Sequence, residues 1–399
     1  MVDSTSLPPD RGGVGRYVDE LIARLPSAGA EVFVVCQAAD AGFYNRLVGQ
    51  DHVFAAPRWV KRPALRFVWE QLGLPALVRR LEPDVMHSPH YTLPIWLRST
   101  GVARVVTLHD ATFFTHPDLH NGIKAKFFAS WTRLSVRVAD ALITPSEATR
   151  DELVTLLGAD PSRFRVILHG VNADRFHRPS EHEIVAMREH LGIGDAPYLA
   201  FLGTLEPRKN LPALVRAYAK VAPNYDVPPK LVLAGTPGWD AHLDEEIAAI
   251  PESLEVVKAG FLPDQLLAPF LGDAVVVAYP SLGEGFGLPL AEAMACGAMV
   301  VTTRELSLPE VGGDAPIYAA SPADHDLADA LTEALDNPQW RAERGRLGVE
   351  RAGALTWFGS AAEHLAVYQS VKPVLPASLT RQLRLRPKRA RQAAPGPVR

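Results

Sequence analysis

The sequence has little cysteine and no long apolar run, and each shortage excludes a class of protein. Only two cysteines, Cys36 and Cys296, occur in 399 residues, too few and too far apart for a disulfide framework or a cysteine metal cluster. We expect both to be buried thiols. No segment approaches the roughly 20 apolar residues that span a bilayer, and the first ten residues lack the basic and apolar regions of a secretory signal. We therefore expect a cytoplasmic protein.

Composition and charge indicate a folded chain with one unusual end. A hydrophobic content of 47% with 22% charged residues is typical of globular proteins, and 399 residues favour two or three domains. The net charge is −4, but residues 372–399 hold eight Lys or Arg and no acid, which leaves −12 on the rest. This basic tail is too poor in apolar patterning to fold alone. It is either solvated and disordered or in peripheral contact with an anionic membrane surface. We expect no nucleic-acid partner.

In the first half of the chain, short apolar runs alternate with helical stretches. The runs cover residues 31–36, 84–89, 103–110, 139–146 and 164–170. This alternation predicts a parallel sheet with helices on both faces, whose ligands bind beyond the carboxyl ends of the strands.

At the N-terminus, before these runs, a strand end too short to hold a sheet position by itself leads into Gly12, Gly13 and Gly15. These glycines precede a helix that we expect from about Gly15 to Leu25, and such a turn is a candidate anion cradle. The short strand indicates either a start further upstream or a sheet that tolerates a clipped first strand.

Polar side chains that follow these runs are candidate ligand contacts. They are His87, His90, His109, Asp110, Ser146, His169 and Asn172. Each histidine could instead make structural hydrogen bonds in the core. His109 and Asp110 stand out because they form a titratable pair at the end of a strand.

A second alternation begins after a polar segment at residues 178–197 that resembles a hinge with a small helix. Its apolar runs cover residues 198–203, 230–235, 254–260, 274–281 and 298–303. We therefore predict two doubly wound domains, at residues 1–185 and 186–355. A helix at residues 356–371 is expected to cross back to the first domain. SLPE at residues 307–310 matches a capping box, and we expect a structural role for it.

The first turn of the second half, residues 203–210, carries two cations. Arg208 and Lys209 precede a helix that Asn210 is expected to cap, and cations beside free helix N–H groups suit a diphosphate. A solvated surface pair is the alternative.

The most informative stretch is residues 279–297, YPSLGEGFGLPLAEAMACG. An apolar strand ends in a turn broken by three glycines, and a helix with Pro289 in its first turn follows. Carboxylates accept hydrogen bonds from sugar hydroxyls, so we interpret Glu284 and Glu292 as hydroxyl binders. The alternatives are a solvated loop charge and an ordinary helix-surface residue. Glu292 has almost only apolar neighbours in the sequence, and a charge in an apolar helix implies a partner.

Taken together, these segments resemble retaining glycosyltransferases of family 4, whose GT-B fold places two Rossmann-like domains across a cleft. The resemblance rests on GGVG at 12–15, HD at 109–110, GTLEPRKN at 203–210 and EGFGLPLAE at 284–292, the Glu-x7-Glu signature of the family. The motifs occur in the family's order and cover most of residues 1–370. The wording of HDATFFTHPD and GTLEPRKN is most similar to bacterial O-antigen-type mannosyltransferases, which use GDP-mannose.

The resemblance implies a division of roles within the donor site. Glu292 would bind the donor ribose, and Glu284 would hold the transferred sugar together with the backbone of Gly285, Phe286, Gly287 and Leu288. Lys209 and Arg208 would neutralise the diphosphate, Gly13 would approach a phosphate across the cleft, and His109 would touch the donor sugar. Thr204 stands where many members carry an arginine, so Arg208 is expected to take more of the phosphate work.

For the reaction, the resemblance implies that the leaving diphosphate itself accepts the acceptor's proton. The protein then contributes orientation and electrostatic stabilisation, and we expect no cofactor and no metal. A UDP-sugar donor, a sugar-nucleotide epimerase or phosphorylase on the same scaffold, and a non-catalytic partner subunit are the alternatives. The acceptor, a glycan or a lipid-linked glycan, is expected on the first domain, where residues 57–73 mix Trp, Phe, Arg and Lys. An ordinary amphipathic helix would explain that segment equally.

Overall fold

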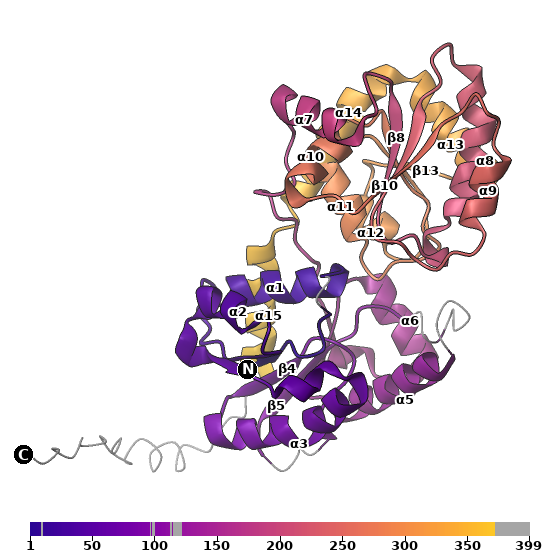
Figure 1. The fold of residues 1–399 in the computed structure, drawn as a ribbon. Helices are drawn as coiled ribbons and strands as arrows, with labels where there is room; N and C mark the ends of the chain where they lie inside the picture. The colour runs from indigo at the N-terminus through magenta and orange to yellow at the C-terminus, as the bar shows by residue number, and fades with distance from the viewer. Residues whose placement is uncertain (9–10, 96, 98–99, 112–113, 115–121, 372–399) are drawn as a thin grey trace, which may run out of the picture.

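The computed structural model describes residues 1–8, 11–95, 97, 100–111, 114 and 122–371. They form two α/β domains, one above the other in Figure 1, which confirms the predicted fold class. The basic tail lies outside the described residues, and its membrane contact stays a prediction. Within the described residues, no helix combines the length and the apolar character needed to cross a bilayer.

The first domain is built on a sheet of seven strands in the order β3-β2-β1-β4-β5-β6-β7, with every pair parallel. Most of its strands are short, rich in valine and buried, as expected where helices cover both faces. The strands are β1 (Val2–Asp3), β2 (Val34–Cys36), β3 (Val53–Ala55), β4 (Val85–Ser88), β5 (Ala103–Thr107), β6 (Ala141–Thr144) and β7 (Phe164–Val166). The helices are α1 (Gly13–Arg24), α2 (Ala41–Val48), α3 (Pro63–Leu81), α5 (Gly122–Val138) and α6 (Glu147–Leu157).

The two-residue strand β1 lies at the centre of this sheet. Val2 pairs with Val34 of β2 and with His87 of β4, and the amino group of Met1 donates to the carbonyl of Val85 at 2.8 Å. Pairing on both sides therefore gives the short strand its position. The helix that follows begins at Gly13, two residues before the predicted start, because Gly12 already accepts the first helical hydrogen bond, from Arg16 N–H.

The second domain is built on a six-stranded parallel sheet in the order β10-β9-β8-β11-β12-β13. Its strand order reverses beside β8, and ligands of such sheets bind at that reversal. The strands are β8 (Tyr198–Leu202), β9 (Lys230–Ala234), β10 (Val256–Gly260), β11 (Val276–Tyr279), β12 (Val300–Thr302) and β13 (Ile317–Tyr318). The helices are α7 (Glu181–Leu191), α8 (Leu211–Val221), α9 (Leu243–Ala249), α10 (Asp264–Gly272), α11 (Leu288–Ala295), α12 (Leu308–Gly312), α13 (Asp324–Asp336) and α14 (Pro338–Gly353).

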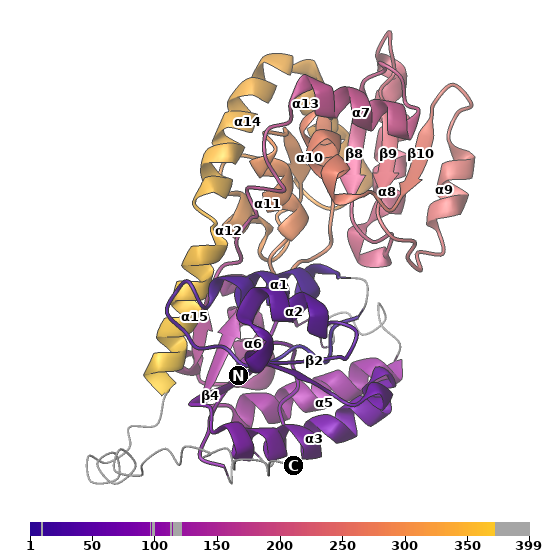
Figure 2. The same ribbon diagram turned by 60° about the vertical axis from the view of Figure 1, so that its left-hand side comes forward.

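Two helices connect the domains in the region where we predicted the boundaries. Residue 185 lies inside α7, which a capping box of Ser180 and Glu183 starts and which packs on α10 of the second domain. At the other end, α15 (Trp357–Val371) follows α14 along one side of the molecule and packs on α1 and β5 of the first domain (Figure 2). The chain thus crosses between the domains twice, beside the carboxyl ends of both sheets.

Candidate functional site

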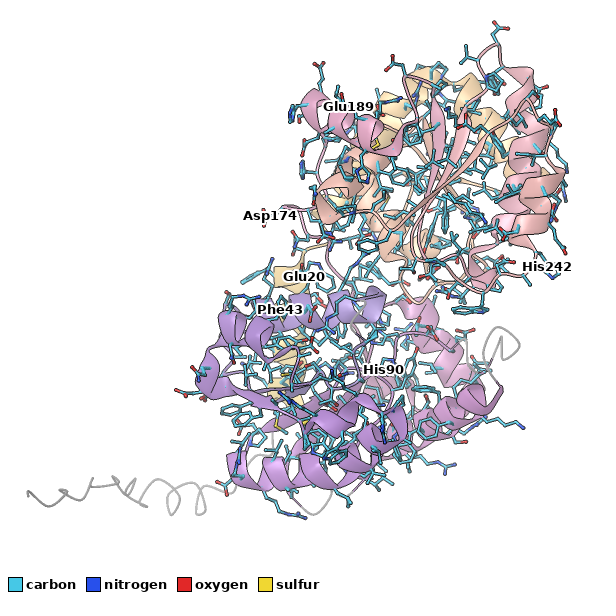
Figure 3. The ribbon with its side chains drawn as sticks, viewed as in Figure 1. Glu20, Phe43, His90, Asp174, Glu189 and His242 are labelled. Atoms are coloured by element: carbon cyan, nitrogen blue, oxygen red, sulfur yellow. The ribbon has the colours of Figure 1, made fainter. Side chains whose placement is uncertain are left out.

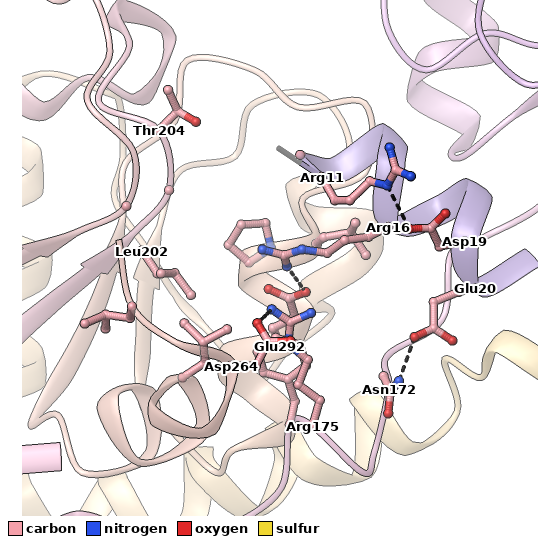
Figure 4. Close-up of a pocket in the computed structure, with 18 of the residues that line it drawn as sticks. Arg11, Arg16, Asp19, Glu20, Asn172, Arg175, Leu202, Thr204, Asp264 and Glu292 are labelled. Carbon is pink, nitrogen blue, oxygen red and sulfur yellow. Dashed lines mark hydrogen bonds and ion pairs between the residues drawn. The ribbon is translucent and has the colours of Figure 1, made fainter. Parts of the chain in front are cut away.

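A cavity of about 510 Å³ lies between the two domains. On one side are α1 and the linker after β7, and on the other are the carboxyl ends of β8 and β9 and the start of α11 (Figure 4). Glu20 and Phe43 mark the face of the first domain that meets the second (Figure 3). Polar residues of the lining include Arg11, Arg16, Asp19, Glu20, Asn172, Arg175, Thr204, Thr236, Asp264 and Glu292.

Glu292 is the predicted residue that the structure places most clearly in this cavity. The apolar residues around it on α11 belong to the core, and they leave Glu292 itself only 3% exposed. One carboxylate oxygen, Oε1, accepts from Arg16 Nη1 across the cleft, whereas Oε2 is buried without a hydrogen-bond partner in the described part of the chain. Leaving a buried carboxylate oxygen unsatisfied is costly, so this geometry suits a ligand that donates hydroxyl groups.

Glu284, in contrast, is surrounded by donors and does not line the cavity. Its Oε1 accepts from Lys209 Nζ at 2.6 Å, from Ser281 Oγ at 2.6 Å and from Tyr279 O–H at 2.9 Å. Its Oε2 pairs with Arg208 Nη1 at 2.5 Å. We call these five residues the Glu284 cluster. The structure brings the predicted sugar-binding glutamate and both predicted phosphate cations together, but as partners of one another.

The charges in the Glu284 cluster stabilise one another. Burial alone raises the pKa of Glu284, but the adjacent Arg208 and Lys209 cations outweigh it and hold that pKa well below its usual range. Burial and the neighbouring Arg208 lower the pKa of Lys209, whereas Glu284 opposes this. Arg208 also bonds Glu206, Nη2 to Oε1, at 2.7 Å. With Glu206 included, two cations lie against two carboxylates. A further anion binds beside them only if these ion pairs rearrange.

The loop that carries Glu284 touches the first domain directly. Ser146 Oγ, at the start of α6, donates to the carbonyl of Gly285 at 2.6 Å, and Thr149 Oγ1 does so at 3.2 Å. A Cβ added at Gly285 would lie 1.6 Å from the carbonyl oxygen of His109, so only glycine permits this approach. Gly287 has φ +93°, a left-handed conformation that favours glycine, and it precedes α11.

His109 lies next to this loop but not in the cavity. Its ring is buried, and its Nε2 bonds the carbonyl of Pro89 at 2.7 Å, which requires the N–H at that position. Burial lowers its pKa, so the ring is neutral. The Phe286 ring contacts His169, whose ring lies 6.1 Å from that of His109. The predicted contact of His109 with a donor sugar stays a prediction.

The remaining predicted donor contacts lie around the cavity. Thr204 lines it, with its hydroxyl 3.1 Å from that of Thr236. Leu288 lines it from the start of α11, and a Cβ on Gly13 would lie 3.9 Å from the Leu288 side chain, so the two face each other across the cleft. Gly12, rather than Gly13, reaches the cavity.

Two local sequence interpretations are wrong because tertiary contacts replace the expected caps. Asn210 makes no side-chain cap and instead donates Nδ2 to the carbonyl of Pro322 at 2.8 Å. Ser307 donates to the carbonyl of Glu284 at 2.7 Å, and Glu310 accepts from the backbone N–H groups of residues 147 and 148 at the start of α6. The Ser307 bond stays within the second domain, whereas the Glu310 bonds join the two domains.

The described residues contain no group of three or more His, Cys, Asp or Glu side chains arranged to hold a metal ion. The chain does contain one Asp-x-Asp triplet, Asp324-His325-Asp326, at the start of α13. Asp324 pairs with Lys220 at 2.7 Å, and Asp326 accepts from Ser321. Neither lines the cavity, and the absence of a metal requirement stays a prediction.

Two doubly wound domains around a cleft with a Glu-x7-Glu segment define a glycosyltransferase of the GT-B class. The model of Glycosyltransferase Family 4 matches residues 11–175, and that of Glycosyl transferases group 1 matches residues 184–349. This chain belongs to glycosyltransferase family 4, as the resemblance indicated.

Relatives and solved structures agree over almost the whole chain. O-antigen chain mannosyltransferase B of Escherichia coli is 28% identical over 371 residues, covering 90% of this chain and 96% of its own. D-inositol 3-phosphate glycosyltransferase of Actinosynnema mirum is 32% identical over 402 residues, covering 92% and 94%. The structure of sucrose-phosphate synthase from Thermosynechococcus elongatus superposes with a TM-score of 0.73 at 21% identity, covering 92% and 98%, which shows the shared fold.

Proposed function

We propose that this glycosyltransferase moves mannose from GDP-mannose, with retention at the sugar, to a glycan or lipid-linked acceptor. The observation that carries the donor class is the buried Glu292 carboxylate. Glu292 lines the cavity at the reversal point of the second sheet, and its Oε2 has no hydrogen-bond partner among the described residues. Mannose is favoured by the similarity to the O-antigen mannosyltransferase over 96% of that protein's length.

In this proposal, both oxygens of Glu292 accept bonds from the ribose hydroxyls. Thr204 and the start of α11 with Leu288 surround the phosphates, because backbone N–H groups and the helix dipole favour negative charge there. Gly13, which faces Leu288 from the first domain, approaches a phosphate from across the cleft. The backbone of residues 285–288 and Glu284 hold the sugar, and Arg208 and Lys209 shift partly from Glu284 toward the diphosphate as it departs. The diphosphate itself takes the acceptor's proton.

A panel of sugar nucleotides tests the donor assignment. We expect nucleotide release from GDP-mannose to exceed that from GDP-glucose, UDP-glucose and UDP-N-acetylglucosamine by about 10-fold or more, a 1.4 kcal/mol difference. Glu292→Gln, which removes a charged hydrogen bond, should lower kcat/KM by about 10- to 100-fold. Activity confined to a UDP-sugar would overturn the mannose assignment and leave the family unchanged.

Metal removal tests a second part of the proposal. Because Arg208, Lys209 and helix N-termini supply the positive charge, we expect the turnover number to stay within about two-fold of its starting value after EDTA treatment. Manganese or magnesium added back should have no effect. Activity lost in EDTA and restored by manganese contradicts this expectation.

A further inference from the structure

One arginine of the cavity lining, Arg16, was not indicated by the sequence motifs. Arg16 lies on α1, one turn after Gly12, and both residues face the cavity. The Arg16 side chain is 28% exposed, and Nη1 is bonded to Glu292, 276 residues away in the sequence. We propose that Arg16 exchanges partners when the donor binds, leaving Glu292 for the donor's diphosphate while Glu292 turns to the ribose. This inference rests on the proposed nucleotide-sugar site.

The charges of the cavity explain why such an exchange is needed. Among the described residues that line it, three arginines face four carboxylates, which leaves an excess of negative charge. A diphosphate adds at least two more negative charges and therefore needs a cation at its position. Lys209 and Arg208 lie in the Glu284 cluster, outside the lining, and are already paired.

The other two arginines of the lining pair with groups that the proposed donor does not replace. Arg11 donates to Asp19 at 3.1 Å, to Asp40 at 2.8 Å and to the carbonyl of Pro8 at 2.7 Å. Arg175 pairs with Asp264 at 2.5 Å and stacks on its own neighbour Phe176. Moving either would break pairs that a nucleotide does not replace.

The Arg16–Glu292 pair differs because the proposed ligand replaces both halves of it. A ribose offers two hydroxyl donors to the Glu292 carboxylate, one for each oxygen. Oε2 has no hydrogen-bond partner among the described residues, so it gains one. A phosphate offers the guanidinium two oxygens in the planar arrangement that arginine binds best. Both partners therefore gain bonds in the loaded site. The pair also links α1 of the first domain to α11 of the second. The exchange therefore replaces a direct bond between the domains with a connection through the bound donor.

Binding calorimetry with GDP, guanosine, UDP and uridine separates the phosphate contribution from that of the nucleoside. The readout is the ratio of diphosphate affinity to nucleoside affinity for the base that binds. Arg16→Gln should lower this ratio by about 10- to 100-fold, the range for losing a charged hydrogen-bonding pair. Its nucleoside affinity should stay equal or rise, because Glu292 no longer has a competing partner. Arg46→Gln, on α2 of the same domain and outside the cavity lining, should keep the wild-type ratio.

Glu292→Gln provides an independent arm that keeps Arg16 in place. It should weaken nucleoside binding but keep or raise the ratio, since Arg16 is released from its carboxylate. An unchanged ratio in Arg16→Gln, or a ratio lowered in Glu292→Gln, overturns the exchange. A wild-type chain that binds none of the four probes overturns the nucleotide-sugar site itself, which is a different outcome.

Discussion

Lys209→Ala is expected to lower turnover by about 100-fold or more, the scale found when one transition-state charge contact is removed. Lys209 Nζ bonds both Glu284 and Tyr279 in a buried position. Without it, Arg208 faces Glu206 and Glu284 alone, and the charge of the cluster taken together with Glu206 changes from neutral to negative. A negative cluster opposes a departing diphosphate, so the loss should appear in kcat with saturating donor.

The same substitution leaves a buried carboxylate with fewer partners, which typically costs 3–5 kcal/mol, on the order of a third of the stability of a domain. The thermal midpoint must therefore be measured beside kcat, and the assay run well below it. Lys230→Ala removes a lysine that pairs with Glu255 at 2.8 Å on the surface of the same domain, and it should leave kcat unchanged. Near-normal turnover in a folded Lys209→Ala variant would reject the role of Lys209.

Much of the fold could be predicted because parallel strands buried on both faces produce apolar runs. The runs at residues 198–203 and 230–235 correspond to β8 and β9 almost residue for residue. The edge strands β3 and β13 were missed because they are both short and only partly buried, so no apolar run marks them. The start of α1 was placed two residues late because a Gly-rich segment gives no propensity signal.

The candidate site could be predicted in part, where local sequence dictates the environment. Glu292 stood out as a carboxylate in an apolar helix, and the structure buries it in the cavity wall. Its partner Arg16 had no local signal, because the contact depends on how two separate domains meet. The same reason applies to Glu310. Its sequence pattern predicts a cap on its own helix, but its carboxylate instead caps α6 of the first domain.

Gly285→Ala should reduce kcat/KM by about 100-fold or more, the cost of displacing reacting groups by about 1 Å. An added Cβ would lie 1.6 Å from the His109 carbonyl oxygen and 3.3 Å from Asp110 Cβ, both in the opposite domain. Backbone cannot yield as a side chain can, so the domains must separate and the bonds from Ser146 to the Gly285 carbonyl must break.

Gly283→Ala is the matched control for this variant, since its Cβ would meet only the end of the Leu306 side chain, at 2.9 Å. That side chain can rotate away, so the control should stay within a few-fold of wild type. Nucleotide affinity should change less than turnover in Gly285→Ala, because Thr204 and Glu292 both belong to the second domain and keep their relative positions. Equal kcat/KM in the two variants would show that the close contact between the loop and His109 is not required for transfer. A large loss confined to Gly285→Ala would instead identify domain closure at this contact as the step that assembles the site.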